Sequence, residues 1–225
     1  MCKLTDEQML RYFIFKDCGF DEEIAKKSYD FVMGNEQPEP QPESKPATEL
    51  ADGIYLMYGK TAVPYTGYEV SKDGKEGCTG IGIKFGGKSL VVALNDISDD
   101  DIELTTKQGG TRFITDYHQA AEDMDGKAAT DDIRDILSMC IADDEYIPSL
   151  GELYFMLAHF TRINAALEAV GGEPLRNDWY WSSTQYSATG AWGLYLGDGD
   201  AYNLGPKAAG QCRVRPVSAF LPLNS

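Results

Sequence analysis

Three stretches near the end of the chain decide the fold: WYWSST at residues 179–184, AWGLYLG at residues 191–197 and RVRPVSAF at residues 213–220. In the middle stretch large apolar residues occupy every second position: Trp192, Leu194 and Leu196. Such a period of two is typical of a β-strand with one buried face. We therefore expect these three side chains to pack inward and the residues between them to face outward as one patch.

The region before these strands mixes helical and strand patterns. Ser149 is a good helix N-cap, and an apolar stripe runs from Leu153 to Val170 before Gly171-Gly172 ends the helix. Further helices are expected at residues 115–124 and 130–141, the second capped by Thr130. Strands are expected at residues 54–58, 79–85 and 90–94, and an acidic loop at 96–103. This order of elements predicts an α+β domain over residues 50–225.

The first 49 residues differ in composition from the rest. Residues 1–34 predict a helical N-terminal segment, either an attachment or oligomerisation element or a plain appendage. Residues 35–49 are rich in Pro and Glu, which is typical of an extended linker.

Bulk composition narrows the function classes. A net charge of −16 argues against nucleic acid or an anionic membrane as partner. No apolar run reaches the ~20 residues that span a bilayer, and the start of the chain lacks the pattern of a secretory signal. The five cysteines are scattered and read as reduced thiols. From Tyr146 onward six acids face five bases, so we expect a near-neutral terminal surface that carries all three tryptophans.

Sequence matches to catalytic or cofactor-binding motifs lack the structural context that those motifs require. Residues 82–89, GIKFGGKS, match the phosphate-loop pattern, but a strand-like LVVALND follows where a helix is required, so a hairpin turn is expected. His159 is expected to be structural. Two acidic clusters could in principle hold calcium, but we expect solvated carboxylates: Asp96, Asp99, Asp100 and Asp101, and Asp198 with Asp200. We expect no cofactor and no metal.

One ordered set of motifs carries a family resemblance. YIPSLGEL at residues 146–153, WYWSST, Ala191-Trp192 and RVRPVSAF together resemble the variable proteins of diversity-generating retroelements and related bacterial lectin-like domains. The resemblance covers residues 146–222, with weaker support back to Leu50. It implies a C-type-lectin-like fold that binds a cell-surface receptor or another protein or glycan ligand. Phage members of the family are receptor-binding proteins at tail-fibre tips. The resemblance therefore also implies a location in the virion, with extracellular display or a cytoplasmic location before assembly as the alternatives, and either a homotrimer or attachment to a fibre through residues 1–34.

Two departures from related proteins limit the resemblance. Glu173-Pro174 is followed by Leu175, which departs from the calcium-dependent sugar-binding tripeptide. Formylglycine-generating enzymes share the fold but use a cysteine pair, and Cys212 has no expected partner. A binding protein is therefore expected, with a structural fibre module as the alternative and an enzyme as the less favoured one.

The resemblance also places the binding positions in a variable region at about residues 179–212. In the family, outward positions are diversified through randomised adenines in AAY codons, which never produce Trp, Lys, Gln, Glu or Met. Between residues 186 and 212 only Trp192, Lys207 and Gln211 belong to that excluded set. Tyr186, Tyr195 and Tyr202 are the expected anchors, because tyrosine provides large contact area at little entropy loss. The other ligand-binding candidates are Ser187, Ala188, Thr189, Gly190, Gly193, Gly197, Asp198, Asp200, Leu204, Gly205, Pro206, Ala208, Ala209, Gly210 and Cys212. A merely solvated sheet face is the alternative for these positions.

Overall fold

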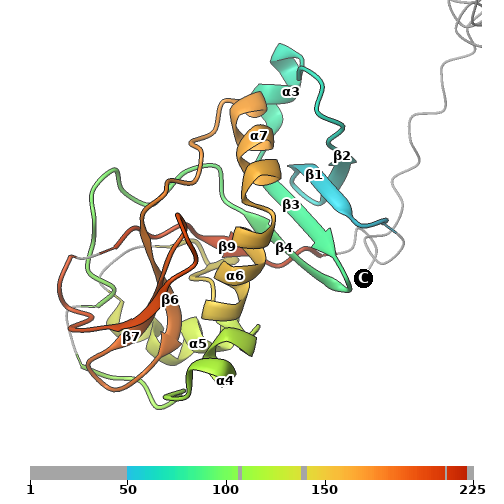
Figure 1. Ribbon diagram of the computed structural model, residues 1–225. Helices are drawn as coiled ribbons and strands as arrows, with labels where there is room; N and C mark the ends of the chain where they lie inside the picture. The colour runs from blue at the N-terminus through green and yellow to red at the C-terminus, as the bar shows by residue number, and fades with distance from the viewer. Residues whose placement is uncertain (1–49, 106–107, 138–140, 211, 222–225) are drawn as a thin grey trace, which may run out of the picture. The chain divides into compact units, whose positions relative to one another are not determined.

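A computed structural model describes residues 50–105, 108–137, 141–210 and 212–221. All of them belong to one compact unit, residues 44–225. It combines antiparallel sheets with helices, as expected of the α+β class (Figure 1). The predicted helical segment at 1–34 and linker at 35–49 lie outside the described residues and stay predictions.

The larger sheet has six antiparallel strands in the order β2-β1-β3-β4-β9-β5. Its strands are β1 (Gly53–Tyr58), β2 (Thr61–Pro64), β3 (Gly80–Phe85), β4 (Lys88–Val92), β5 (Glu145–Tyr146) and β9 (Val217–Ser218). The late strand β9 pairs with both β4 and β5. The last described strand therefore lies in the same sheet as the first four strands. Gly86 and Gly87 form the β3–β4 turn with φ of 58° and 79°, which confirms a hairpin rather than a phosphate loop.

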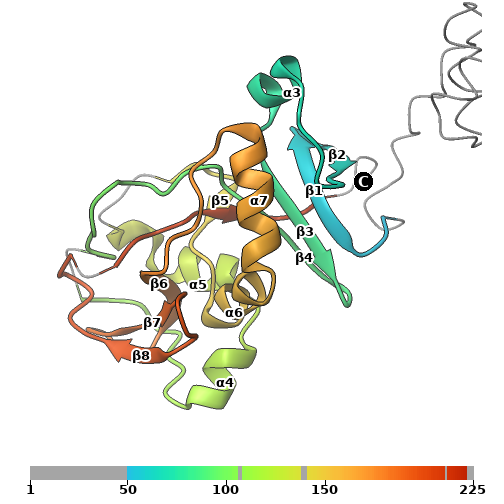
Figure 2. The same cartoon turned by 45° about the horizontal axis from the view of Figure 1, so that its top comes forward.

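A smaller antiparallel sheet contains the segment that the sequence singled out. It consists of β6 (Trp179–Gln185), β7 (Ala191–Tyr195) and β8 (Ala201–Leu204), in that order (Figure 2). The β7–β8 turn contains Gly199 with a φ of 87°, a left-handed conformation that glycine adopts at no steric cost.

The predicted helix after Ser149 is confirmed at its start and end but is divided in two. Ser149 and Glu152 form a reciprocal capping box at the start of α6 (Leu150–Ala158). The backbone leaves helical geometry at His159, and α7 (Phe160–Val170) then ends at Gly171 with a φ of 81°. His159 stacks on Phe85 at 3.9 Å between ring centroids, a structural contact.

The described residues between β4 and β5 include three short helices: α4 (Tyr117–Glu122), α5 (Gly126–Ile133) and η2 (Arg134–Ile136). The predicted start at Thr130 is wrong, because α5 begins at Gly126 with Asp125 as its cap. Thr130 instead exchanges two hydrogen bonds with the backbone of Ile147, at 3.1 and 3.0 Å. Strand β2 and helix α3 (Lys72–Gly77) were not expected from the sequence.

Two apolar clusters lie on opposite faces of β6 and β7. The main core packs α6 and α7 against the large sheet and includes Tyr180 and Leu194. A second core contains Trp181 and Ala191 together with side chains from residues 104–147 and 212–214. Because alternate strand residues point to opposite faces, the small sheet is covered on both sides over part of its area. This arrangement decides which predicted positions reach the surface.

Candidate ligand-binding surface

The alternation in β7 is confirmed for its inward half. Trp192, Leu194 and Leu196 are all buried. Gly193 is buried as well, so the expectation that it faces outward is wrong. A Cβ atom at Gly193 would lie 2.4 Å from Cδ1 of Leu204, which shows that the Leu204 side chain from β8 covers this position.

Two further predicted positions are buried. Gly190 accepts hydrogen bonds at its carbonyl from Tyr186 and Ser187, and a Cβ there would lie 2.7 Å from Asn203 Oδ1. Cys212 pairs with Ile102 in an isolated bridge, and burial raises the pKa of its thiol. The expectation that Gly190 and Cys212 form the binding surface is therefore wrong.

Eighteen binding positions were predicted, and the other fifteen are exposed or half-buried. Exposed positions are Ala188, Thr189, Gly197, Asp198, Asp200, Tyr202, Gly205, Pro206, Ala208 and Gly210. Half-buried positions are Tyr186, Ser187, Tyr195, Leu204 and Ala209. They come from the β6–β7 turn, the β7–β8 hairpin and the loop after β8.

Two of the three predicted tyrosine anchors lie together. Tyr195 stands opposite Trp179 in the β6–β7 register, and Tyr202 stands opposite Gly193 in the β7–β8 register. The indole ring of Trp179 lies 5.6 Å from the Tyr195 ring and 5.7 Å from the Tyr202 ring, measured between centroids. We call Trp179, Tyr195 and Tyr202 the aromatic platform.

The polar atoms of the platform have no hydrogen-bond partner among the described residues. No described residue hydrogen-bonds to Trp179 Nε1, Tyr195 Oη or Tyr202 Oη, whereas the indole nitrogens of Trp181 and Trp192 donate to backbone carbonyls at 2.9 and 2.8 Å. Tyr202 is 56% exposed, and Trp179 and Tyr195 are half-buried. Trp179 was not among the binding residues predicted from the sequence. Its place beside Tyr195 follows from the pairing of β6 with β7, which the sequence alone does not give.

The third predicted anchor, Tyr186, belongs to a different aromatic group. Its ring contacts Trp192 edge-on at 5.5 Å, and Tyr117 lies 6.1 Å from the same indole. Tyr117 and Tyr154 share a hydrogen bond of 2.9 Å between hydroxyls, and the Tyr154 hydroxyl donates to Gly199 O at 3.0 Å. This group links α4 and α6 to the β7–β8 hairpin. Because Trp192 and Tyr195 have opposite parity on β7, Tyr186 is separated from the platform.

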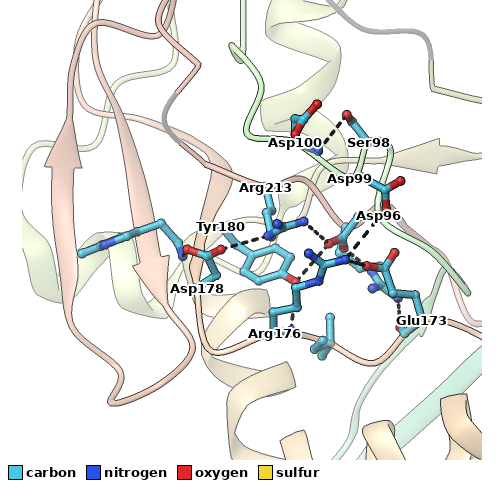
Figure 3. Close-up of polar contacts among 12 residues, drawn as sticks. Asp96, Ser98, Asp99, Asp100, Glu173, Arg176, Asp178, Tyr180 and Arg213 are labelled. Carbon is cyan, nitrogen blue, oxygen red and sulfur yellow. Dashed lines mark hydrogen bonds and ion pairs between the residues drawn. The ribbon is translucent and has the colours of Figure 1, made fainter.

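A buried ion-pair network anchors the strand that carries Trp179 (Figure 3). The carboxylate of Asp96 accepts a 2.6 Å bond from Arg215 Nε and a 3.2 Å bond from the Tyr180 hydroxyl. Arg213 lies 3.6 Å from the same carboxylate and donates to Asp178 Oδ2 at 3.0 Å. Arg215 also donates to the backbone carbonyls of Ala93 and Glu173, at 3.0 and 2.9 Å.

The Asp96 side chain is fully buried, so the expectation of a solvated carboxylate is wrong at this position. Asp99, Asp100 and Asp101 are exposed, as expected. Burial raises the pKa of Asp96, against the opposing effect of Arg215. Two guanidinium groups share this one buried carboxylate, and Asp178 supplies the second carboxylate through Arg213. Nη1 of Arg213 and Nη2 of Arg215 have no hydrogen-bond partner among the described residues.

A second buried cation holds the loop after β8. Lys207 is 1% exposed, and its ammonium donates to Gln185 Oε1 at 2.6 Å and to Gly109 O at 3.0 Å. Gln185 in turn donates to Asp132 at 2.8 Å. Burial lowers the pKa of Lys207 to about 8, and the nearby carboxylate of Asp132 only partly opposes this. Lys207 is therefore an anchor of the loop and not a surface charge.

These buried cations change the electrostatic character of the surface. Lys207 is the only base among residues 178–210, and it is buried, while the three acids of that segment are Asp178, Asp198 and Asp200. Asp198 and Asp200 are exposed, and the side chain of Asp178 is 39% exposed. The expected near-neutral surface is therefore wrong over residues 178–210. Of the five bases from Tyr146 onward, Lys207, Arg213 and Arg215 are buried and Arg162 and Arg176 are exposed, so the balance of charges along the chain is not the balance at the surface.

Comparison with family models and with curated proteins finds no match. Among solved structures, a fimbrial protein from Bacteroides ovatus is similar over 75% of this chain, with a TM-score of 0.47 and 16% sequence identity. The matched region spans 48% of that protein, about half its length. A likeness this slight supports no argument about function.

No helix within the described ranges has the length and apolar content needed to cross a bilayer. No three His, Cys, Asp or Glu side chains in the same ranges lie close enough together to hold a metal ion.

Proposed function

We propose that this chain is a ligand-binding display protein with a C-type-lectin-like domain, similar to the variable proteins of diversity-generating retroelements. The main support is that, between residues 186 and 212, the described residues which randomised AAY codons cannot produce are buried. The two such residues described between 186 and 212 are Trp192 and Lys207, which are 7% and 1% exposed. Each described residue of that segment that is exposed or half-buried belongs to the set that such codons can produce. The segregation supports a fixed interior beneath a changeable surface.

The framework around the surface suits this role. Asp96 with Arg213 and Arg215 holds one side of β6, and Lys207 holds the loop after β8. Both anchors act through buried side chains, so substitutions at the exposed positions leave them intact. Rigid support under variable loops is how binding sites retain their shape while their chemistry changes.

The proposal assigns the chain no catalytic role. The enzymatic alternative requires a reactive cysteine, and reactive cysteines are accessible thiolates with lowered pKa values. Cys212 has the opposite properties, since its side chain is buried and burial raises the pKa of its thiol. A described partner cysteine near it is also lacking, because Cys78, the other free cysteine of the described ranges, belongs to the main core.

The resemblance also supplies the setting that we propose. The chain binds a cell-surface receptor or another protein or glycan ligand, as part of a phage tail-fibre tip in the virion. Attachment to the fibre and assembly into a homotrimer are assigned to residues 1–34.

Alanine substitution of the platform tyrosines tests the binding role. We expect Tyr195→Ala/Tyr202→Ala to keep the circular dichroism spectrum and lose adsorption of the displayed chain to target cells. Tyr68→Ala is the matched control, since Tyr68 is 79% exposed and lies between β2 and α3. If the double variant adsorbs normally but fails to assemble into fibres, the structural-module alternative is correct.

Sequencing the DNA around the gene tests the diversification role separately. We expect a near-copy of the 3′ end that differs only at adenines, beside a reverse transcriptase gene. A genomic neighbourhood without this template removes the retroelement from the proposal and leaves the binding role to the adsorption experiment.

A further inference from the structure

We propose that the aromatic platform, with Asp178, Asp198 and Asp200 beside it, binds a cationic side chain, above all arginine, of a protein ligand. This inference rests on the proposed binding function and assigns the chemistry of its ligand.

The surface around the platform is negatively charged. Within residues 178–210 the only base is buried and the three acids are accessible. Asp178 is shared with Arg213, but the structure gives the Asp200 carboxylate no described cationic partner. Arg176, the nearest base in the sequence before Asp178, pairs with Glu173 and Asp99. The surface therefore presents negative charge without a counter-charge of its own.

Backbone hydrogen bonds in the hairpin hold Asp198 and Asp200 close to Tyr195 of the platform. Tyr195 N donates to Asp200 O at 2.8 Å, and Asp200 N donates to Asp198 Oδ1 at 3.0 Å. A Cβ at Gly197 would lie 2.4 Å from the Tyr195 ring, so this ring lies across the start of the hairpin turn. On the other side, Asp178 Oδ1 accepts a 2.8 Å bond from Trp179 N. Leu196 N donates to Asp178 O at 3.0 Å, so Asp178 and the β7–β8 turn lie at the same end of the small sheet, and the acids lie at that end of the platform.

The aromatic rings of the platform can bind a cation through their faces, in addition to the carboxylates. A guanidinium over the face of Trp or Tyr is attracted by the ring quadrupole, and its planar fork matches a carboxylate. Trp179 gives the strongest such face, and Tyr195 and Tyr202 contact it at 5.6 and 5.7 Å. Arginine can stack on this surface and donate to Asp198 or Asp200 in the same pose.

A glycan satisfies the platform less well. A neutral sugar leaves the exposed carboxylates without a counter-charge, and an acidic sugar is repelled by them. The net charge of −16 adds a long-range attraction for a basic protein surface and raises its rate of encounter at low salt. The structure therefore favours a basic protein over a carbohydrate.

Indole resonances of the full chain provide a direct test. The probe is the peptide acetyl-Gly-Arg-Gly-Arg-Gly-amide, and its control replaces both arginines by neutral, nearly isosteric citrulline. We expect the arginine peptide to shift the Nε1–H signal of Trp179 and to leave those of Trp181 and Trp192, which are bonded inside the protein, unchanged. The citrulline peptide should bind at least about fivefold more weakly, as expected from the loss of exposed ion-pair and cation–π contacts.

Matched charge variants separate a local site from general attraction to an acidic protein. Asp198→Asn/Asp200→Asn should weaken the arginine peptide at least about fivefold. Glu69→Gln/Asp73→Asn removes the same charge at Asp73 in α3 and at Glu69 just before it. Helix α3 lies at the other end of the unit from β7 and β8 (Figures 1 and 2), so this variant should leave binding within about twofold.

Each remaining outcome overturns the cation assignment. If the citrulline peptide or a neutral oligosaccharide shifts Trp179 as strongly, the platform is not selective for cations. If no probe shifts Trp179, or if both charge variants weaken binding equally, no local cation site exists. In all of these cases the proposed binding function is still tested independently, by whether the Tyr195→Ala/Tyr202→Ala variant adsorbs to target cells.

Discussion

Replacement of Lys207 by methionine makes a quantitative test of the anchor beneath the surface. Lys207→Met preserves the length of the side chain and removes its charge. In the native protein the ammonium is held by the carbonyl oxygens of Gln185 and Gly109, with no carboxylate in direct contact. Burial therefore lowers the pKa of Lys207 from 10.5 to about 8.

The magnitude follows from proton linkage. Between pH 8 and 10.5 the unfolded chain binds a proton at Lys207 that the folded chain lacks, so stability rises with pH across this window. Below pH 8 both states are protonated and the destabilisation is fully present. At about 1.4 kcal/mol per pH unit, the whole effect is about 3 kcal/mol.

Urea unfolding of both proteins at pH 7, 8, 9 and 10 measures this effect. Tyrosine and cysteine ionisation occurs in both proteins and cancels in the difference between wild type and Lys207→Met. That difference should rise by about 2.5 kcal/mol in favour of the wild type from pH 7 to pH 10. A difference that stays constant within about 0.5 kcal/mol across this range would refute the assignment of Lys207 as a buried anchor.

Three further predictions concern the framework. Asp96→Asn should destabilise the protein by about 3–5 kcal/mol in urea unfolding, because it leaves the fully buried Arg215 without its counter-charge, whereas Asp99→Asn at an exposed site should change stability by less than about 0.5 kcal/mol. Gly126→Ala should cost more than about 2 kcal/mol by thermal or urea unfolding, since its Cβ would lie 2.1 Å from Glu152 Oε2; a variant as stable as wild type would contradict this packing. Burial raises the pKa of Glu152 from 4.5 to about 7, so the folded state holds an extra proton between these values and stability should fall by about 3 kcal/mol as pH rises through that window; Glu152→Gln should abolish this fall, and an unchanged pH dependence would argue against it.

Local patterns in the sequence predicted the elements of the domain well. Ser149 caps a helix as expected because its hydroxyl and the Glu152 carboxylate satisfy backbone groups within one turn. Gly86-Gly87 forms a hairpin turn because glycine alone adopts positive φ freely at both positions. Trp192, Leu194 and Leu196 point inward because strand residues alternate between two faces. Each of these outcomes depends on residues close together in the chain.

Long-range packing decided what the sequence left open. The alternation in β7 could not show that Leu204 of the neighbouring strand covers Gly193, because this depends on how β7 and β8 pair. It also could not show that the second core, with residues such as Leu104 and Ile147 from distant parts of the chain, covers Trp181 and Ala191 on the same face. The same holds for charge. The sequence by itself determined which bases and acids are present, and only the tertiary structure decided that Lys207, Arg213 and Arg215 are buried while Asp198 and Asp200 remain in water. Burial is a property of contacts between segments far apart in sequence, and it makes the candidate surface both aromatic and acidic.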